Sequence, residues 1–123
     1  MQLMLYNSKN DKNGQRLTAA VQEALPHRPI GIFRQLTDLQ ELLCTIVEPD
    51  SIAILSAVDQ VELRRMQELR GLLTEIFVVL VVPDCKKSTI RLAHLMLPRF
   101  ISQKEDTYSD LKEVLKKMVS TSH

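Results

Sequence analysis

The chain has 123 residues, of which 45% are hydrophobic and 25% are charged, values typical of one ordinary globular domain. The 16 Lys and Arg residues nearly balance the 15 Asp and Glu residues, which gives a formal net charge of +1. A charge this small creates no electrostatic field strong enough to attract nucleic acid or an anionic membrane. Trp is absent and aromatic residues make up only 4%, which also argues against a surface on which bases stack. We therefore expect a single domain, residues 1–123, that binds neither nucleic acid nor membranes.

The compartment follows from the apolar runs and the cysteines. No apolar run approaches the roughly 20 residues of a membrane-spanning helix, and the opening MQLMLYN lacks the charged lead of a signal peptide. Cys44 and Cys85 lie far apart, without the spacing of metal ligands, which favours reduced thiols. We expect a cytoplasmic protein with no metal and no cofactor.

Short apolar runs alternate with longer amphipathic segments along the chain. The predicted strands are LMLY (3–6), IGIF (30–33), IAIL (52–55), IFVVLVV (76–82) and FIS (100–102). The β-branched run 76–82 is typical of an interior strand that is buried on both faces of a parallel sheet. Pro29 and Gly31 indicate an edge position for 30–33.

The segments between the strands predict helices. In chain order they cover about 14–25, Thr37 to before Pro49, Asp59 to about 73, near Ser88 to before Pro98, and about 108–118. Thr37 with Gln40, and more weakly Asp59 with Glu62, give the spacing of helix amino-terminal caps. The third helix should turn Met66, Leu69, Leu72 and Leu73 inward. Strands and helices that alternate with such short connections require a parallel sheet covered on both faces, with the strand order 2-1-3-4-5.

In a sheet of this kind, ligands bind outside the carboxyl ends of the strands. These ends are Asn7-Ser8, Ser56-Ala57, Val82-Pro83-Asp84 and Ser102-Gln103-Lys104. By length, element order and strand spacing, nearly the whole chain resembles the receiver domain of two-component response regulators. The resemblance implies a three-layer (βα)5 sandwich of the flavodoxin and receiver type, and a role in signalling.

Receivers carry acidic residues after the first strand, a phosphorylated aspartate after the third, a hydroxyl residue after the fourth and a lysine after the fifth. The corresponding positions here hold, in chain order, Asn7 and Ser8, then Ser56, then Val82, and then Gln103, with Lys104 one residue later. Magnesium requires hard oxygen ligands and an aspartyl phosphate requires a carboxylate, so both are excluded at these positions. The resemblance therefore implies a degenerate receiver that is neither phosphorylated nor an enzyme. Asp11 and Asp59 are displaced candidates, although a helix cap also explains Asp59.

The predicted fourth helix suggests two further sites. Lys86 and Lys87, followed by Ser88, stand at its start, where a phosphate or another anion could bind. The alternative is that these lysines are simply solvated. The anion site would make the protein a small-ligand sensor for an anion or a nucleotide.

The second site is an interface on the same helix. Ile90, Ala93 and Leu97 can form its inward stripe, and Leu92, Leu95 and Met96 cannot all share that stripe at 100° per residue. A leftover apolar patch of this kind commonly marks a protein interface. Its polar rim would be Arg91, His94 and Arg99, opposite Glu105, Asp106 or Glu113 of a second copy. The preferred function is thus a phosphorylation-independent interaction or regulatory module that binds a protein partner or forms a homodimer, although ordinary core packing could also bury these residues.

Overall fold

The structure is a computed structural model that describes residues 2–9, 11–45, 47–104 and 107–121. The strands are β1 (Leu3–Asn7), β2 (Ile30–Phe33), β3 (Ile52–Ser56), β4 (Phe77–Val82) and β5 (Phe100–Gln103). The helices are α1 (Lys12–Ala24), α2 (Leu36–Leu43), α3 (Gln60–Gln67), α4 (Lys87–His94) and α5 (Ser109–Thr121), with a 3₁₀ turn, η1 (Arg70–Leu73). All strand pairs are parallel, and the sheet order β2-β1-β3-β4-β5 confirms the predicted α/β fold.

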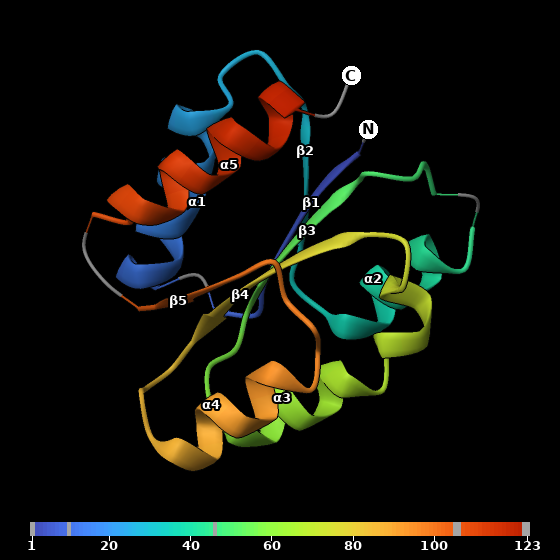
Figure 1. The fold of residues 1–123 in the computed structure, drawn as a ribbon, viewed down its shortest axis with the longest axis vertical. Helices are drawn as coiled ribbons and strands as arrows, with labels where there is room; N and C mark the ends of the chain where they lie inside the picture. Colours follow the sequence, from blue (N-terminus) through green and yellow to red (C-terminus); the bar gives the residue numbers. More distant parts are fainter. Residues whose placement is uncertain (1, 10, 46, 105–106, 122–123) are drawn as a thin grey trace.

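The helices form two layers around the sheet. Figure 1 shows α1 and α5 together on one face, with α2, α3 and α4 on the other. Because successive strand side chains point to opposite faces, Leu5 and Ile54 pack toward α1 and α5, whereas Met4 and Leu55 pack toward α2, α3 and α4. The strand β4 is interior and β2 lies at an edge, as predicted.

Two aspartates begin helices. The side chain of Asp59 accepts a hydrogen bond of 2.8 Å from the Glu62 amide, which confirms the predicted cap of α3. Asp11 caps α1 in the same way, through a bond of 2.8 Å from the Gly14 amide. Both carboxylates therefore cap the amino termini of helices, a role that the sequence indicated only for Asp59.

The predicted cap of α2 is wrong. Gln35 is its N-cap residue, without a capping side-chain bond, and Thr37 lies inside the first turn. The helix begins early because only Arg34 and Gln35 separate it from β2, and Leu36 is already buried against the core. In the described part of the chain, the N-cap residue of α2 consequently accepts no capping hydrogen bond with its side chain.

Two predicted inward residues point outward. Leu72 is 37% exposed because α3 ends at Gln67 and the chain continues as a 3₁₀ turn, which changes the angle between successive side chains. Leu97 is 83% exposed with a φ of 51°, because α4 ends at His94. Met96, with 3% exposure, takes the core position instead.

Within the described ranges, no helix combines the length and apolar character needed to cross a bilayer. Glu105 and Asp106, which were predicted as acidic partners of an interface, lie outside the described residues.

Candidate functional site

The residues at the receiver-like positions meet at one edge of the sheet. Asn7 and Ser56 are register partners at the ends of β1 and β3, and Val82 and Gln103 are partners at the ends of β4 and β5. Ser8, which follows β1, is half-buried. Lys104 follows β5, and its amide donates to the Val82 carbonyl at 3.2 Å. The fold therefore brings these residues to the carboxyl edge of the sheet, and none of them is acidic.

The Asn7 side chain is buried and is not exposed to solvent. Its side chain is on the α1 side of the sheet and only 3% of the residue is exposed. Its Oδ1 accepts a long bond of 3.4 Å from the Lys9 amide, whereas its buried Nδ2 has no hydrogen-bond partner in the described part of the chain. A Cβ atom on Gly14 would stand 2.1 Å from that Nδ2. The first turn of α1 thus closes over Asn7.

The remaining edge positions are also occupied by local contacts. Ser56 and Val82 are 3% and 1% exposed. The Cys85 thiol donates a hydrogen bond of 2.8 Å to Oε1 of Gln103. Among the described residues, no group of three His, Cys, Asp or Glu side chains is arranged to hold a metal ion.

The start of α4 has an anion of its own. The Asp84 carboxylate accepts a bond of 2.9 Å from the Lys86 amide, and hydrogen bonds from Thr89 and from that amide lower the pKa of Asp84. Ser88 accepts a bond of 2.8 Å from the Gln60 amide group. The Lys86 and Lys87 side chains are exposed and Ser88 follows them, but a carboxylate of the chain already binds at this helix start.

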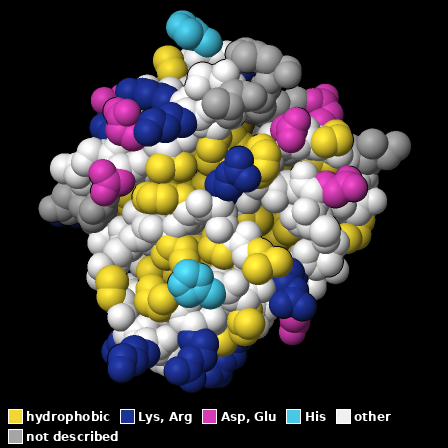
Figure 2. All heavy atoms as spheres, in the orientation of Figure 1, with side chains coloured by type: hydrophobic (Ala, Val, Ile, Leu, Met, Phe, Trp, Pro, Cys, Tyr) yellow, Lys and Arg dark blue, Asp and Glu magenta, His cyan; other side chains and the backbone are white. Residues whose placement is uncertain are grey.

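A groove of about 560 Å³ runs along the outer face of α4. Its lining residues are Cys85, Lys87, Ile90, Arg91, His94 and Leu95. Figure 2 shows hydrophobic side chains gathered over this part of the surface around a histidine, with Lys and Arg side chains below them. Leu95 is 47% exposed, which leaves an apolar side chain in open solvent.

Three of the six predicted interface residues line this groove: Arg91, His94 and Leu95. Met96 belongs to the core, and the Leu92 carbonyl accepts a bond of 3.0 Å from Gln67 on α3. The Arg99 guanidinium lies 4.4 Å from the centre of the Phe77 ring, a cation–π contact outside the groove. Leu92, Met96 and Arg99 differ from the prediction because α4 packs against α3 and ends at His94.

A smaller cavity of about 280 Å³ opens at the carboxyl edge between α2 and α3. Its lining residues are Tyr6, Ser8, Arg34, Gln35, Leu36, Thr37, Glu62 and Arg65. The Tyr6 hydroxyl donates to Oε2 of Glu62 at 3.0 Å, and Oε1 accepts a bond of 3.0 Å from the Val58 amide. Sequence reasoning missed this group because Tyr6 read as a strand residue and Glu62 only as part of a cap.

We expect Tyr6 to resist ionisation. Its burial, followed by the negative charge and the hydrogen bond of Glu62, raises its pKa from 10.0 to about 12. Because the folded-state pKa is the higher one, the associated stability is complete below pH 10 and is lost as the pH rises toward 12. A pH titration of tyrosinate absorbance on the parent and on Tyr6→Phe measures this difference. Tyr6→Phe should remove the tyrosinate transition at the higher pH. Loss of a transition near pH 10 instead would contradict the expectation.

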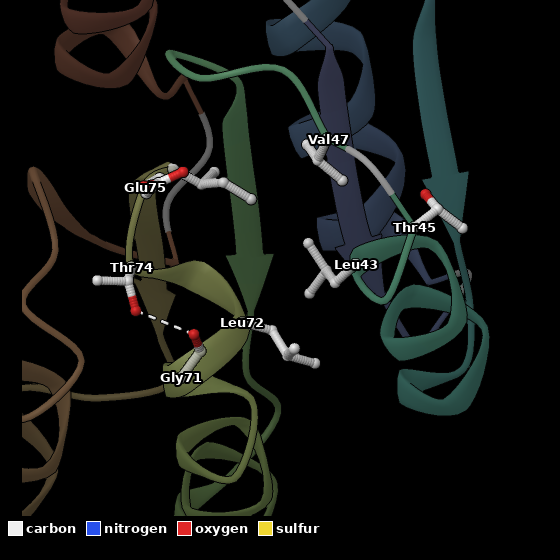
Figure 3. A pocket seen from close by; sticks show the side chains of 8 residues that line it. Leu43, Thr45, Val47, Gly71, Leu72, Thr74 and Glu75 are labelled. Carbon is white, nitrogen blue, oxygen red and sulfur yellow. Dashed lines mark hydrogen bonds between the residues drawn. The ribbon is translucent and has the colours of Figure 1, made fainter.

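Another cavity, of about 450 Å³, lies at the opposite, amino-terminal edge of the sheet. Figure 3 shows Leu43 and Val47 on one side of it and Leu72 on the other. The Thr74 hydroxyl donates to the Gly71 carbonyl at 2.9 Å, as the dashed line in Figure 3 marks. The hydroxyl of Thr45 likewise donates to a backbone carbonyl. Both hydroxyls are thus used locally, and Glu75 is the charged side chain among the described lining residues.

Comparisons with protein-family models and with curated proteins find no match to the chain. Among solved structures, the crystal structure of a "putative pilus assembly-related protein" from Burkholderia pseudomallei K96243 is similar, with a TM-score of 0.71 and 17% sequence identity. The match covers 98% of this chain and 90% of that chain. At this level of identity the likeness concerns the fold, and the chain has a receiver-like, flavodoxin-like scaffold.

Proposed function

We propose that the chain is a phosphorylation-independent, non-enzymatic interaction module, and that the α4 groove binds an apolar, acidic segment of a partner protein. The observation that carries the proposal is the groove itself, because it combines exposed apolar side chains with a cationic rim. The edge where a receiver accepts phosphate contributes Asn7 and Ser56, both buried and neither acidic. The pilus assembly-related description of the structural relative is compatible with a domain that acts by holding partners.

Apolar contact supplies the affinity in this proposal. Leu95 is 47% exposed, and Ile90 is half-buried beside it in the groove. Full burial of an exposed Leu or Ile is worth roughly 1.5–3 kcal/mol, so covering even parts of these side chains is favourable. Exposed apolar patches with a polar rim commonly mark protein interfaces.

Charge selects the partner. Lys87 and Arg91 are cations, and among the described residues no acidic side chain lines the groove. A partner with Asp or Glu around its apolar contacts complements this rim, which improves both specificity and association rate. Two copies that paired through their α4 grooves would bring like charges together. The charges therefore favour a different protein over the homodimer as the occupant of this surface.

The hydrogen-bond partner of the Cys85 thiol supports a non-enzymatic role. Cys85 is the nucleophilic side chain of the groove, and its thiol donates to the amide oxygen of Gln103. An amide does not take up a proton at neutral pH, so it does not activate a thiol.

A selection from a random peptide library on immobilised protein tests the proposal. Peptides rich in Leu, Ile or Phe together with Asp or Glu should be enriched on the parent and lost on Leu95→Glu, which places a negative charge in the groove. Val61→Glu is the matched control, because Val61 is 64% exposed on α3 and lies outside the groove. Equal enrichment on both variants, or enrichment of basic peptides, would refute the proposed occupant. Sedimentation velocity on the same samples reports pairing of two copies, which would also refute it if Leu95→Glu abolished that pairing.

A further inference from the structure

The cavity between α2 and α3 occupies a special place in the fold. It lies outside the end of β1, between the start of α2, which follows β2, and α3, which follows β3. The winding of the sheet reverses at β1, because β2 lies on one side of it and β3 on the other. In open α/β sheets, ligands bind in the crevice outside the strand ends at such a switch point. The α4 groove lies elsewhere and shares none of its lining residues.

The cavity holds two guanidinium groups without ion pairs. Arg34 and Arg65 both line it, and neither has a carboxylate within ion-pair distance among the described residues. Nη1 of Arg34 donates to the Asn7 carbonyl at 3.1 Å, a contact that holds this side chain at the end of β1. Guanidinium groups present several N–H donors in a planar fork that matches phosphate oxygens.

The carboxylate in the cavity does not neutralise both arginines. Glu62 is 8% exposed, and its two oxygens accept from the Tyr6 hydroxyl and from the Val58 amide. Since Tyr6 keeps its proton, Glu62 is the single negative charge against two positive ones. The lining of the cavity thus retains one net positive charge.

The amino terminus of α2 adds polar donors. Its N-cap, Gln35, makes no capping side-chain bond, and Leu36 and Thr37 of the first turn line the cavity. The positive end of the helix dipole favours an anion at this position. Asp38 belongs to the same turn but does not line the cavity. At α4, by contrast, the Asp84 carboxylate already binds the helix start.

We infer that this cavity binds the phosphate group of a small molecule, between the Arg34 and Arg65 guanidiniums and the start of α2. A volume of about 280 Å³ accommodates a phosphate with a short organic substituent, near the lower limit for small-molecule sites. The phosphate site proposed here therefore lies at the start of α2, whereas the sequence suggested an anion site at Lys86, Lys87 and Ser88. Phosphate binding at this cavity does not depend on the partner proposed for α4.

Titration of the isotope-labelled chain with inorganic phosphate, at constant ionic strength set by sodium chloride, tests the inference. We expect saturable amide shifts at Leu36 and Thr37. Arg65→Gln should weaken binding at least about tenfold, since a hydrogen bond between charged groups is lost. Arg34→Lys should weaken it less, because the charge remains while the fork is lost. Lys87→Gln is the matched control at the other helix start and should bind phosphate like the parent.

Shifts confined to α4, shifts that do not saturate, or an unchanged affinity of Arg65→Gln would overturn the inference. Arg65 is exposed, and thermal unfolding of each variant verifies that its fold is intact. Leu95→Glu should bind phosphate normally, so failure at this cavity and failure at the α4 groove are told apart.

Discussion

Replacing Gly14 by Ala is expected to destabilise the protein by about 2 kcal/mol or more, within the range of overpacked interiors. In an open helix the same change stabilises by up to about 1 kcal/mol. Here the new Cβ would stand 2.1 Å from Nδ2 of Asn7 and 2.4 Å from the Lys9 carbonyl oxygen, so the start of α1 must move away from β1. Urea unfolding followed by circular dichroism measures the change.

Gly71→Ala is the matched control, because nothing lies within 4 Å of the position of its Cβ. It should leave stability unchanged or raise it slightly. The double change of Asn7→Ala with Gly14→Ala should recover only part of the loss, since the Lys9 carbonyl remains in the way. Equal stability of the two glycine variants would show that α1 is not packed on Asn7 in this way.

Two neighbouring residues at the end of α4 should respond very differently to the same substitution. Met96→Glu should cost about 4 kcal/mol or more, because Met96 is 3% exposed in the core and a buried, unpaired charge is strongly unfavourable. Such a loss removes much of the roughly 5–15 kcal/mol that stabilises an ordinary domain. Leu95→Glu should change stability by less than about 0.5 kcal/mol, since Leu95 is 47% exposed.

Urea unfolding of both variants makes this comparison directly. If Leu95→Glu unfolded as readily as Met96→Glu, the outer face of α4 would belong to the core. That result would contradict the proposed binding surface. A stable Met96→Glu variant would mean that the helix is rotated from the arrangement described here.

The strands and their order could be predicted because local patterns determine them. The continuous apolar run 76–82 and the Pro29-Gly31 signal each identified the position of a strand in the sheet. The periodicity of α4 was less informative, because its last predicted residues lie beyond the helix. Leu97 adopts a φ of 51° and turns outward, a change that no 100° repeat anticipates.

The cavity between α2 and α3 could not be predicted in the same way. Tyr6 and Glu62 are 56 residues apart, and only the sheet order brings them to one hydrogen bond. Arg34 and Arg65 lie far apart in the sequence, and each reads there as an ordinary exposed cation. The receiver-like positions, by contrast, follow strand ends directly, so their location at one edge could be predicted even though their contacts could not.

The most direct test of an interaction surface on α4 is an amide chemical-shift titration of the labelled chain with an acidic, apolar peptide from the selection. We predict saturable shifts along Lys87–His94 and at Leu95, with the same affinity before and after incubation with an acyl-phosphate donor and magnesium. Shifts that map to other elements, or binding that appears only after the donor is added, would contradict it.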